Sequence, residues 1–138
     1  HNDLAPWNLI MGDRWVFIDW DAAAPSTRLW DLAYAAQTFT LSDAAGEPAR
    51  AARALAAFVD GYGAGRQLRE RLPDAMSRRT AAMYELLQSS NLAGKEPWAS
   101  MFTDGHGEHW ETTARYVHDH REVWAAALAA RPNGSGAA

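Results

Sequence analysis

The sequence contains no cysteine among its 138 residues. This absence excludes a disulfide-stapled fold and a zinc site with thiolate ligands, and it fits a reducing cytoplasm, where we expect the protein to act. Positive charge is also scarce, because 13 Lys and Arg residues stand against 17 Asp and Glu residues, for a net charge of −4. We therefore expect neither a nucleic acid nor an anionic membrane surface as a partner. No apolar run approaches the length of a membrane span, and no segment has the pattern of a signal peptide.

Alanine, by contrast, is abundant, which favours helices. The length suits one domain. Because residue 1 is a histidine rather than a methionine, we expect this chain to be part of a longer product. We place the domain at residues 1–132 and a flexible tail at residues 133–138, where a proline, an asparagine and a glycine follow the last helical pattern.

The order of apolar patterns predicts a hairpin followed by helices. Residues 9–11 and 15–18 are short apolar runs around the turn signal Gly12-Asp13, and their aromatic and β-branched content favours strands. The spacing then becomes helical. We expect one helix after a Ser26 or Thr27 cap, with Leu29, Leu32, Ala33 and Ala36 on one face, and further helices at 47–62, 74–88 and 110–128. The predicted fold is mainly α (α+β overall).

The strongest chemical signal lies in residues 1–8. Asp3 is followed five positions later by Asn8, and Ile18-Asp19-Trp20-Asp21 begins ten residues after that asparagine. Phosphoryl transfer needs a carboxylate to orient the attacking hydroxyl, and an amide oxygen and a second carboxylate to hold magnesium. The two ends of a hairpin lie side by side, so the predicted strands bring Asn8 and Asp19 close together.

These residues resemble the catalytic segments of the aminoglycoside phosphotransferase and choline kinase family, which shares the protein-kinase-like fold. The kinase catalytic loop has the pattern His-x-Asp-Leu-x-x-x-Asn, and this chain matches it with His1, Asp3, Leu4 and Asn8. The resemblance implies a helical C-terminal lobe with a hairpin that carries the catalytic and metal loops. It also implies magnesium and ATP as cofactors. Asp3 is then the catalytic base, and Asn8 and Asp19 are magnesium ligands.

The resemblance also implies supporting roles around the loop. His1 would pin the catalytic loop, and Asp31, within the segment Arg28–Tyr34, would hydrogen-bond it from below. Asn2 stands where protein kinases have arginine, and Asp21 stands where they have the glycine of Asp-Phe-Gly. Both departures favour the small-molecule kinases. Asp21 is either a further metal ligand or a helix cap, and caps are the commoner use of such a residue.

The nucleotide clamp of the family is not among these residues. A glycine-rich loop and a strand lysine hold the ATP phosphates in this fold, and both precede the catalytic loop. The only lysine here is Lys95. We therefore expect the chain alone to be inactive. We also expect it to expose an apolar patch that binds the missing N-terminal lobe or a second copy of the chain.

Several residues of the C-terminal half remain open to more than one interpretation. Carboxylates there could line the pocket of a cationic acceptor, with Trp98 as a pocket wall; the candidates are Asp104, Glu108, Glu111 and Asp119. His106 and His109 are three apart, a spacing that allows a zinc site, although a solvated helix face is the commoner explanation. Most tryptophans suit packing, and we expect Trp30, Trp110 and Trp124 in the core.

Together these patterns predict an ATP- and magnesium-dependent phosphotransferase that acts on a hydroxyl of a small molecule. Two other hypotheses remain. The chain could be a non-catalytic kinase-like remnant that serves as a binding or immunity module. It could also be a phosphohydrolase with Asp3, Asp19 and Asp21 as a carboxylate cluster, although the asparagine at kinase spacing disfavours this.

Overall fold

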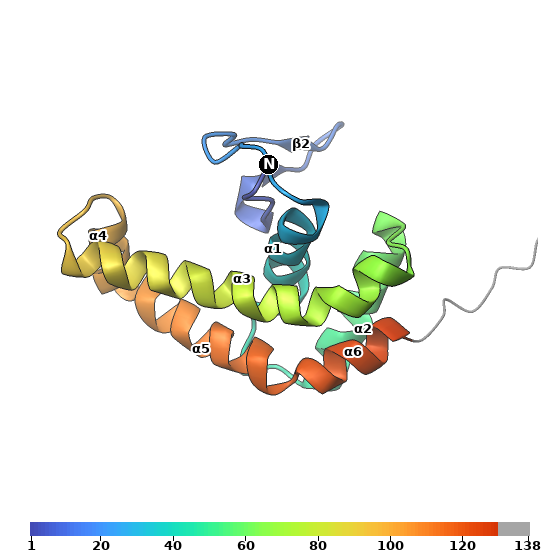
Figure 1. Ribbon diagram of the computed structural model, residues 1–138. Coiled ribbons are helices and arrows are strands. Elements are labelled where there is room, and N and C mark those ends of the chain that lie inside the picture. Colours follow the sequence, from blue (N-terminus) through green and yellow to red (C-terminus); the bar gives the residue numbers. More distant parts are fainter. Residues whose placement is uncertain (130–138) are drawn as a thin grey trace, which may run out of the picture.

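In the computed structural model, which describes residues 1–129, a small hairpin lies on one side of a body of helices (Figure 1). The elements in chain order are a 3-10 turn η1 (Pro6–Asn8), strands β1 (Leu9–Ile10) and β2 (Val16–Phe17), helices α1 (Arg28–Thr40), α2 (Pro48–Tyr62), α3 (Arg66–Leu92) and α4 (Trp98–Met101), a π-helical turn η2 (Phe102–His106), and helices α5 (Gly107–Asp119) and α6 (Arg121–Ala129). The predicted class, mainly helical with one small hairpin, is confirmed. The predicted tail at 133–138, and the end of the predicted domain at residue 132, lie outside the described residues.

The hairpin is shorter than its apolar runs. β1 and β2 are antiparallel, and Leu9 pairs with Phe17 while Ile10 pairs with Val16. The strands bury little, since Trp15 is 72% exposed and Val16 is 50% exposed. Two-stranded hairpins are marginal by themselves, so this one depends on its attachment to the helices.

Helix α1 lies between the hairpin and the long α3 (Figure 1). Thr27 caps it, because its side-chain oxygen accepts a hydrogen bond from the backbone N–H of Trp30 at 3.2 Å. The predicted apolar face is confirmed, with Leu32, Ala33 and Ala36 buried. The helix also buries residues from Tyr34 to Thr38 on its other sides, which reflects its place at the centre of the molecule.

Helix α2 begins at Pro48 as predicted, but α3 is longer than predicted. It runs over 27 residues, from Arg66 rather than Asp74 and to Leu92 rather than Gln88. Pro73 lies inside it, one residue before the predicted start at Asp74. Proline removes one backbone hydrogen bond from a helix. The helix nevertheless continues, because Leu72, Ala75 and Met76 around Pro73 are buried in the core.

The predicted single helix at 110–128 is wrong. It is two helices, α5 and α6, separated at His120, whose backbone (φ −102°, ψ 19°) is not helical. Both helices pack against α3. Together they follow a bent path along it (Figure 1), which a single straight helix could not follow. The Trp124 indole N–H donates to the carbonyl of Val117 at 3.0 Å and so holds the two helices together.

Two apolar clusters hold the helices. The larger joins α1, α2, α3, α5 and α6 and includes Trp124, which is fully buried as predicted. The smaller contains Ala5, Tyr34, Leu87 and Trp110, with Trp98 at its edge. Trp30 is not a core residue, contrary to prediction. It is half-buried, and its ring lies against the guanidinium of Arg79.

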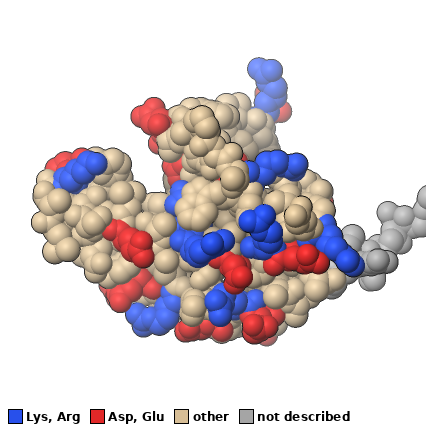
Figure 2. Space-filling model, in the orientation of Figure 1, with Lys and Arg blue, Asp and Glu red and all other residues tan. Residues whose placement is uncertain are grey.

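The surface shows no concentration of one charge on the face drawn in Figure 2, where acidic and basic side chains are interspersed over the helices and charged side chains also mark both ends of the hairpin. Within residues 1–129, none of the helices is both long enough and apolar enough to cross a membrane.

Candidate functional site

The loop of residues 1–8 and the loop after β2 meet at one end of the hairpin. The backbone N–H of Ile18 donates to the carbonyl of Asn8 at 2.9 Å, which extends the strand pairing by one step beyond Leu9 and Phe17. Asn8 accepts this bond and Asp19 directly follows its donor, so the two residues lie at the same end of the hairpin, as predicted.

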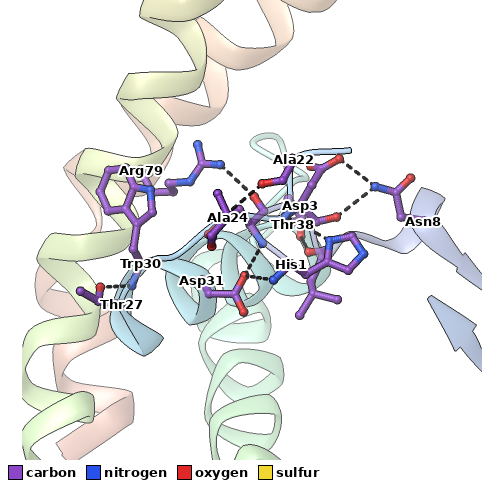
Figure 3. Close-up of polar contacts among 12 residues, drawn as sticks. His1, Asp3, Asn8, Ala22, Ala24, Thr27, Trp30, Asp31, Thr38 and Arg79 are labelled. Carbon is purple, nitrogen blue, oxygen red and sulfur yellow. Dashed lines mark hydrogen bonds and ion pairs between the residues drawn. The ribbon is translucent and has the colours of Figure 1, made fainter. Parts of the chain in front are cut away.

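Asn8 fixes the carboxylate of Asp3. Its amide nitrogen donates to Asp3 Oδ2 at 2.8 Å and to the Asp3 carbonyl at 3.0 Å (Figure 3). Asn8 is buried, at 5% exposure, so its orientation is fixed by its surroundings. Because both bonds use the nitrogen, the side-chain oxygen remains for a cation.

His1 links the catalytic loop to the loop after β2. Its Nε2 lies 3.2 Å from the carbonyl of Ile18, and its Nδ1 accepts from the backbone N–H of Asp3 at 3.3 Å. The imidazole also lies against the ring of Trp20, with 4.4 Å between the ring centres. These contacts are those of a residue that pins one loop to the other.

Asp19 is exposed and has a left-handed backbone, with φ at +59°. Few residues other than glycine tolerate this conformation, and it is common at functional sites. Asp21 lies in the following turn and does not cap α1, because Thr27 has that position. The cap explanation for Asp21 is therefore wrong for the nearest helix.

Asn2 also has a left-handed backbone, with φ at +64°. Its side-chain nitrogen donates to the carbonyls of Ala22 and Ala24, both at 3.1 Å. The residue that replaces the arginine of protein kinases thus ties the catalytic loop to the segment after Asp21.

One face of α1 supports the catalytic loop at three successive residues. Asp31 accepts from the backbone N–H of Asn2 at 2.7 Å, and the hydroxyl of Thr38 donates to the carbonyl of Leu4 at 3.1 Å (Figure 3). Between them, the buried side chain of Tyr34 lies beside Asp3 in the wall of one pocket. Positions 31, 34 and 38 share a helical face, so a single rigid element aligns the whole loop.

The Tyr34 hydroxyl stays protonated at this site. Burial raises its pKa above the ordinary value of 10.0, and the nearby carboxylate of Asp3 raises it further. Tyr34 is 2% exposed.

Arg79, on α3, reaches the same loop from the other side. Its guanidinium donates to the carbonyl of Asn2 at 3.1 Å and lies over the rings of Tyr34 and Trp30, at 4.4 and 5.3 Å from their centres. Burial lowers its pKa, while the negative charges of Asp3 and Asp31 oppose that shift. Sequence reasoning missed Tyr34, Thr38 and Arg79. The first two have a detectable signal, since they follow Asp31 at helical spacing, but nothing local indicates Arg79.

A pocket of about 600 Å³ opens beside Asp3. Figure 2 shows the corresponding notch between the α4 end of the molecule and the part that carries the hairpin. The lining residues come from the catalytic loop, α1, α3, α4, η2 and α5; they are Asp3, Trp7, Tyr34, Met83, Leu87, Trp98, Met101, Asp104, Gly105, His106, His109 and Trp110.

Trp98 and Asp104, two of the predicted pocket residues, lie in this pocket, but Glu108 does not. Glu108 lines a separate, shallower hollow with Asp43. The turn between the two hollows is shaped by glycine. Gly105 has φ at +101°, and a Cβ on Gly107 would lie 2.6 Å from the ring of Phe102.

Neither alternative that needs a cluster of metal ligands is supported. In residues 1–129, no three His, Cys, Asp or Glu side chains are grouped so that they could hold a metal ion. His106 and His109 face the pocket without a third ligand of that kind. Asp3, Asp19 and Asp21 do not form the carboxylate cluster that the phosphohydrolase hypothesis requires.

Comparison with known proteins identifies the family. The model of the "Phosphotransferase enzyme family" matches residues 1–73, more than half of the chain. The chain belongs to the phosphotransferase enzyme family. Comparison with curated proteins and with solved structures gives no match.

The family match covers the hairpin, α1, α2 and the first residues of α3. The predicted resemblance is thereby confirmed, and a kinase-like phosphotransferase activity is indicated. The match stops before Arg79 and before the pocket wall that Trp98, Asp104 and Trp110 provide. This wall therefore lies in the part of the chain that the family model does not match.

Proposed function

We propose that this chain is the C-terminal catalytic lobe of an ATP- and magnesium-dependent phosphotransferase that phosphorylates a hydroxyl of a small molecule. One observation carries the proposal: Asp3 is held by Asn8, beside Tyr34, at the wall of a pocket large enough for a small molecule. Its volume falls within the range of about 300–1,000 Å³ that is usual for such ligands.

Asp3 orients the acceptor hydroxyl and accepts its proton in this proposal. Asn8 donates to its carboxylate, which fixes its direction without neutralising it. Asp31 and Thr38 hold the backbone on either side of Asp3, so the carboxylate keeps its position while the acceptor binds. Alignment of this kind is a large part of catalysis in phosphoryl transfer.

Asn8 and Asp19 suit a magnesium ion that is completed by phosphate oxygens. Magnesium in such sites takes one or two protein oxygen ligands besides the nucleotide. Asn8 offers a free amide oxygen, and Asp19 offers an exposed carboxylate on the adjoining loop. Asp21, two residues further on, is a candidate for an outer contact. When bound, the metal neutralises the charge of the transferred phosphoryl group.

The exposed apolar side of the hairpin supports the presence of a nucleotide-binding lobe in the active protein. Its exposed large side chains are Trp7, Ile10, Met11, Trp15, Val16, Phe17, Ile18 and Trp20. Exposed apolar area on this scale marks an interaction surface. We assign it to contact with the lobe that clamps ATP, and we place the activity in the cytoplasm, where ATP is available.

The test is phosphate transfer from ATP to alcohol acceptors by the longest natural product that contains this chain, with and without Asp3→Asn. The expected result is magnesium-dependent transfer that the substitution lowers by about 10²–10⁴-fold, the usual contribution of a general base. Asp13→Asn is the matched control, because this carboxylate is exposed in the hairpin turn.

The remnant hypothesis predicts a different outcome. A binding or immunity module would transfer no phosphate, and its biological effect would survive Asp3→Asn. Equal transfer by the wild type and Asp3→Asn would show that this aspartate is not the base.

A further inference from the structure

We propose that the acceptor is an alcohol with a bulky apolar body and at most one cationic group, rather than a polyamine sugar. This inference rests on the proposed function, because it takes the pocket beside Asp3 as the acceptor site. It is carried by what lines that pocket and by where the other carboxylates of this region lie.

The walls of the pocket are mainly apolar. Trp98 and Trp110 provide aromatic surface, and Met83, Leu87 and Met101 provide aliphatic surface between them. The same residues form or border the smaller apolar cluster, so they are packed in place rather than free to turn away. A ligand gains affinity here by removing apolar area from water.

The apolar wall begins next to the catalytic carboxylate. Tyr34 lines the pocket beside Asp3, and its ring stacks on Trp110 with 6.1 Å between centres and 19° between planes. An acceptor hydroxyl at Asp3 therefore places the rest of the molecule along the Tyr34–Trp110 surface. Sugars with a hydroxyl or amine on every carbon would leave polar groups unpaired against this surface.

The pocket has too little negative charge for a polycation. Of the residues that line it in the described part of the chain, only Asp3 and Asp104 carry carboxylates. If Asp3 binds the reacting hydroxyl, Asp104 alone is left to pair with an ammonium group. Lys95 lies over the ring of Trp98, with its nitrogen 5.0 Å from the ring centre, and adds a positive charge at the rim.

The acidic groups that would suit more ammonium groups face elsewhere. Asp43 and Glu108 line the separate, shallower hollow. That hollow shares only Gly105 and His109 with the pocket beside Asp3. One cation at Asp104, with the aromatic surface close by, is therefore the most that this pocket accommodates.

The test is titration calorimetry of the full chain with two fixed sets of probes. The first set is quinine, propranolol and menthol, which are apolar alcohols with one, one and no amine. The second set is kanamycin, neomycin and glucose. We expect the tightest member of the first set to bind at least about tenfold more tightly than any member of the second.

Two variants locate the binding. Trp98→Ala, at the half-buried rim, should weaken the first set by about tenfold, whereas Leu92→Ala, an 83% exposed leucine at the end of α3, should change nothing. Asp104→Asn should weaken quinine and propranolol several-fold and leave menthol unchanged. Both variants alter partly exposed residues, so folding should survive, and circular dichroism verifies it.

The outcomes separate this inference from the proposed function. Aminosugars that bind as tightly as the apolar alcohols, or apolar alcohols that bind equally well to Trp98→Ala, would overturn the acceptor class even if the intact protein proves to be a kinase. Binding of the first set that depends on Trp98, without any phosphate transfer by the intact protein, would support the class of ligand and count against the kinase.

Discussion

The hairpin and the helical body are both rich in large apolar side chains, yet they use them in opposite ways. In the body, residues such as Leu55, Val59 and Trp124 are completely buried in one cluster. In the hairpin, Trp15, Met11 and Trp20 are more than half exposed. The body is therefore stabilised by removing apolar surface from water, and the hairpin is not.

Polar contacts hold the hairpin instead. His1 and Asn2 bond to the segment from Ile18 to Ala24, and Asp31 on α1 bonds to Asn2. Such bonds have strict geometry, whereas apolar packing tolerates small shifts. The comparison teaches that the region with the proposed chemistry is positioned by directional bonds, and that its apolar side chains are left free for another surface.

The largest effect should come from breaking the packing of the body. Trp124→Ala should lower the free energy of unfolding by about 3–5 kcal/mol, because it leaves a cavity in the main cluster and removes the bond to Val117. Urea unfolding followed by circular dichroism measures this. Leu92→Ala is the control, and equal midpoints for the two variants would contradict the assignment of Trp124 to the core.

An intermediate, local effect should follow from breaking the polar attachment. Asp31→Ala removes a charge-assisted bond of about 1.5–3 kcal/mol, so the amides of residues 1–10 should exchange hydrogen roughly 10–100-fold faster while α2 and α3 keep their protection. Hydrogen-exchange mass spectrometry resolves the two regions.

A matched carboxylate provides the control for Asp31. Asp60 accepts from Arg69 at 2.6 Å, a similarly short contact, but within the helical body. Asp60→Ala should leave exchange in residues 1–10 unchanged. If it loosens the catalytic loop as much as Asp31→Ala does, the loop is not held specifically by α1.

The smallest effect on stability should come from the hairpin surface. Trp15→Ala should change the free energy of unfolding by less than about 0.5 kcal/mol, because this side chain is 72% exposed. The same substitution should reduce the binding of an apolar dye to the chain. A loss of stability close to that of Trp124→Ala would mean that the hairpin packs on the body in solution.

Local pattern was enough to predict several elements correctly. The hairpin, the start of α2 at Pro48 and the buried face of α1 all follow from spacing within a few residues. The errors arose where distant parts of the chain override local signals. Helix α3 extends beyond the predicted range 74–88 at both ends and contains Pro73, and the stripe from Trp110 to Leu128 is broken at His120 so that both halves lie on α3.

The candidate site divides in the same way. Asp3, Asn8 and Asp19 could be predicted as candidates because these residue types occur at a characteristic spacing in two loops joined by one hairpin. Arg79 could not, because it is 77 residues from its partner Asn2 and no local pattern connects them. Glu108 was predicted to line the pocket because it is acidic. It lies instead in a different hollow, beyond the turn at Gly105.

The sequence by itself determined the helical class and the hairpin, and it was enough to predict which residues carry kinase-type chemistry, because periodicity and motif spacing are properties of neighbouring residues. Only the tertiary structure decided that α1 supports three successive residues of the catalytic loop, that Arg79 reaches that loop, and that the pocket beside Asp3 is aromatic rather than acidic. These facts depend on how the helices cross, and that is set by the packing of residues far apart in the chain.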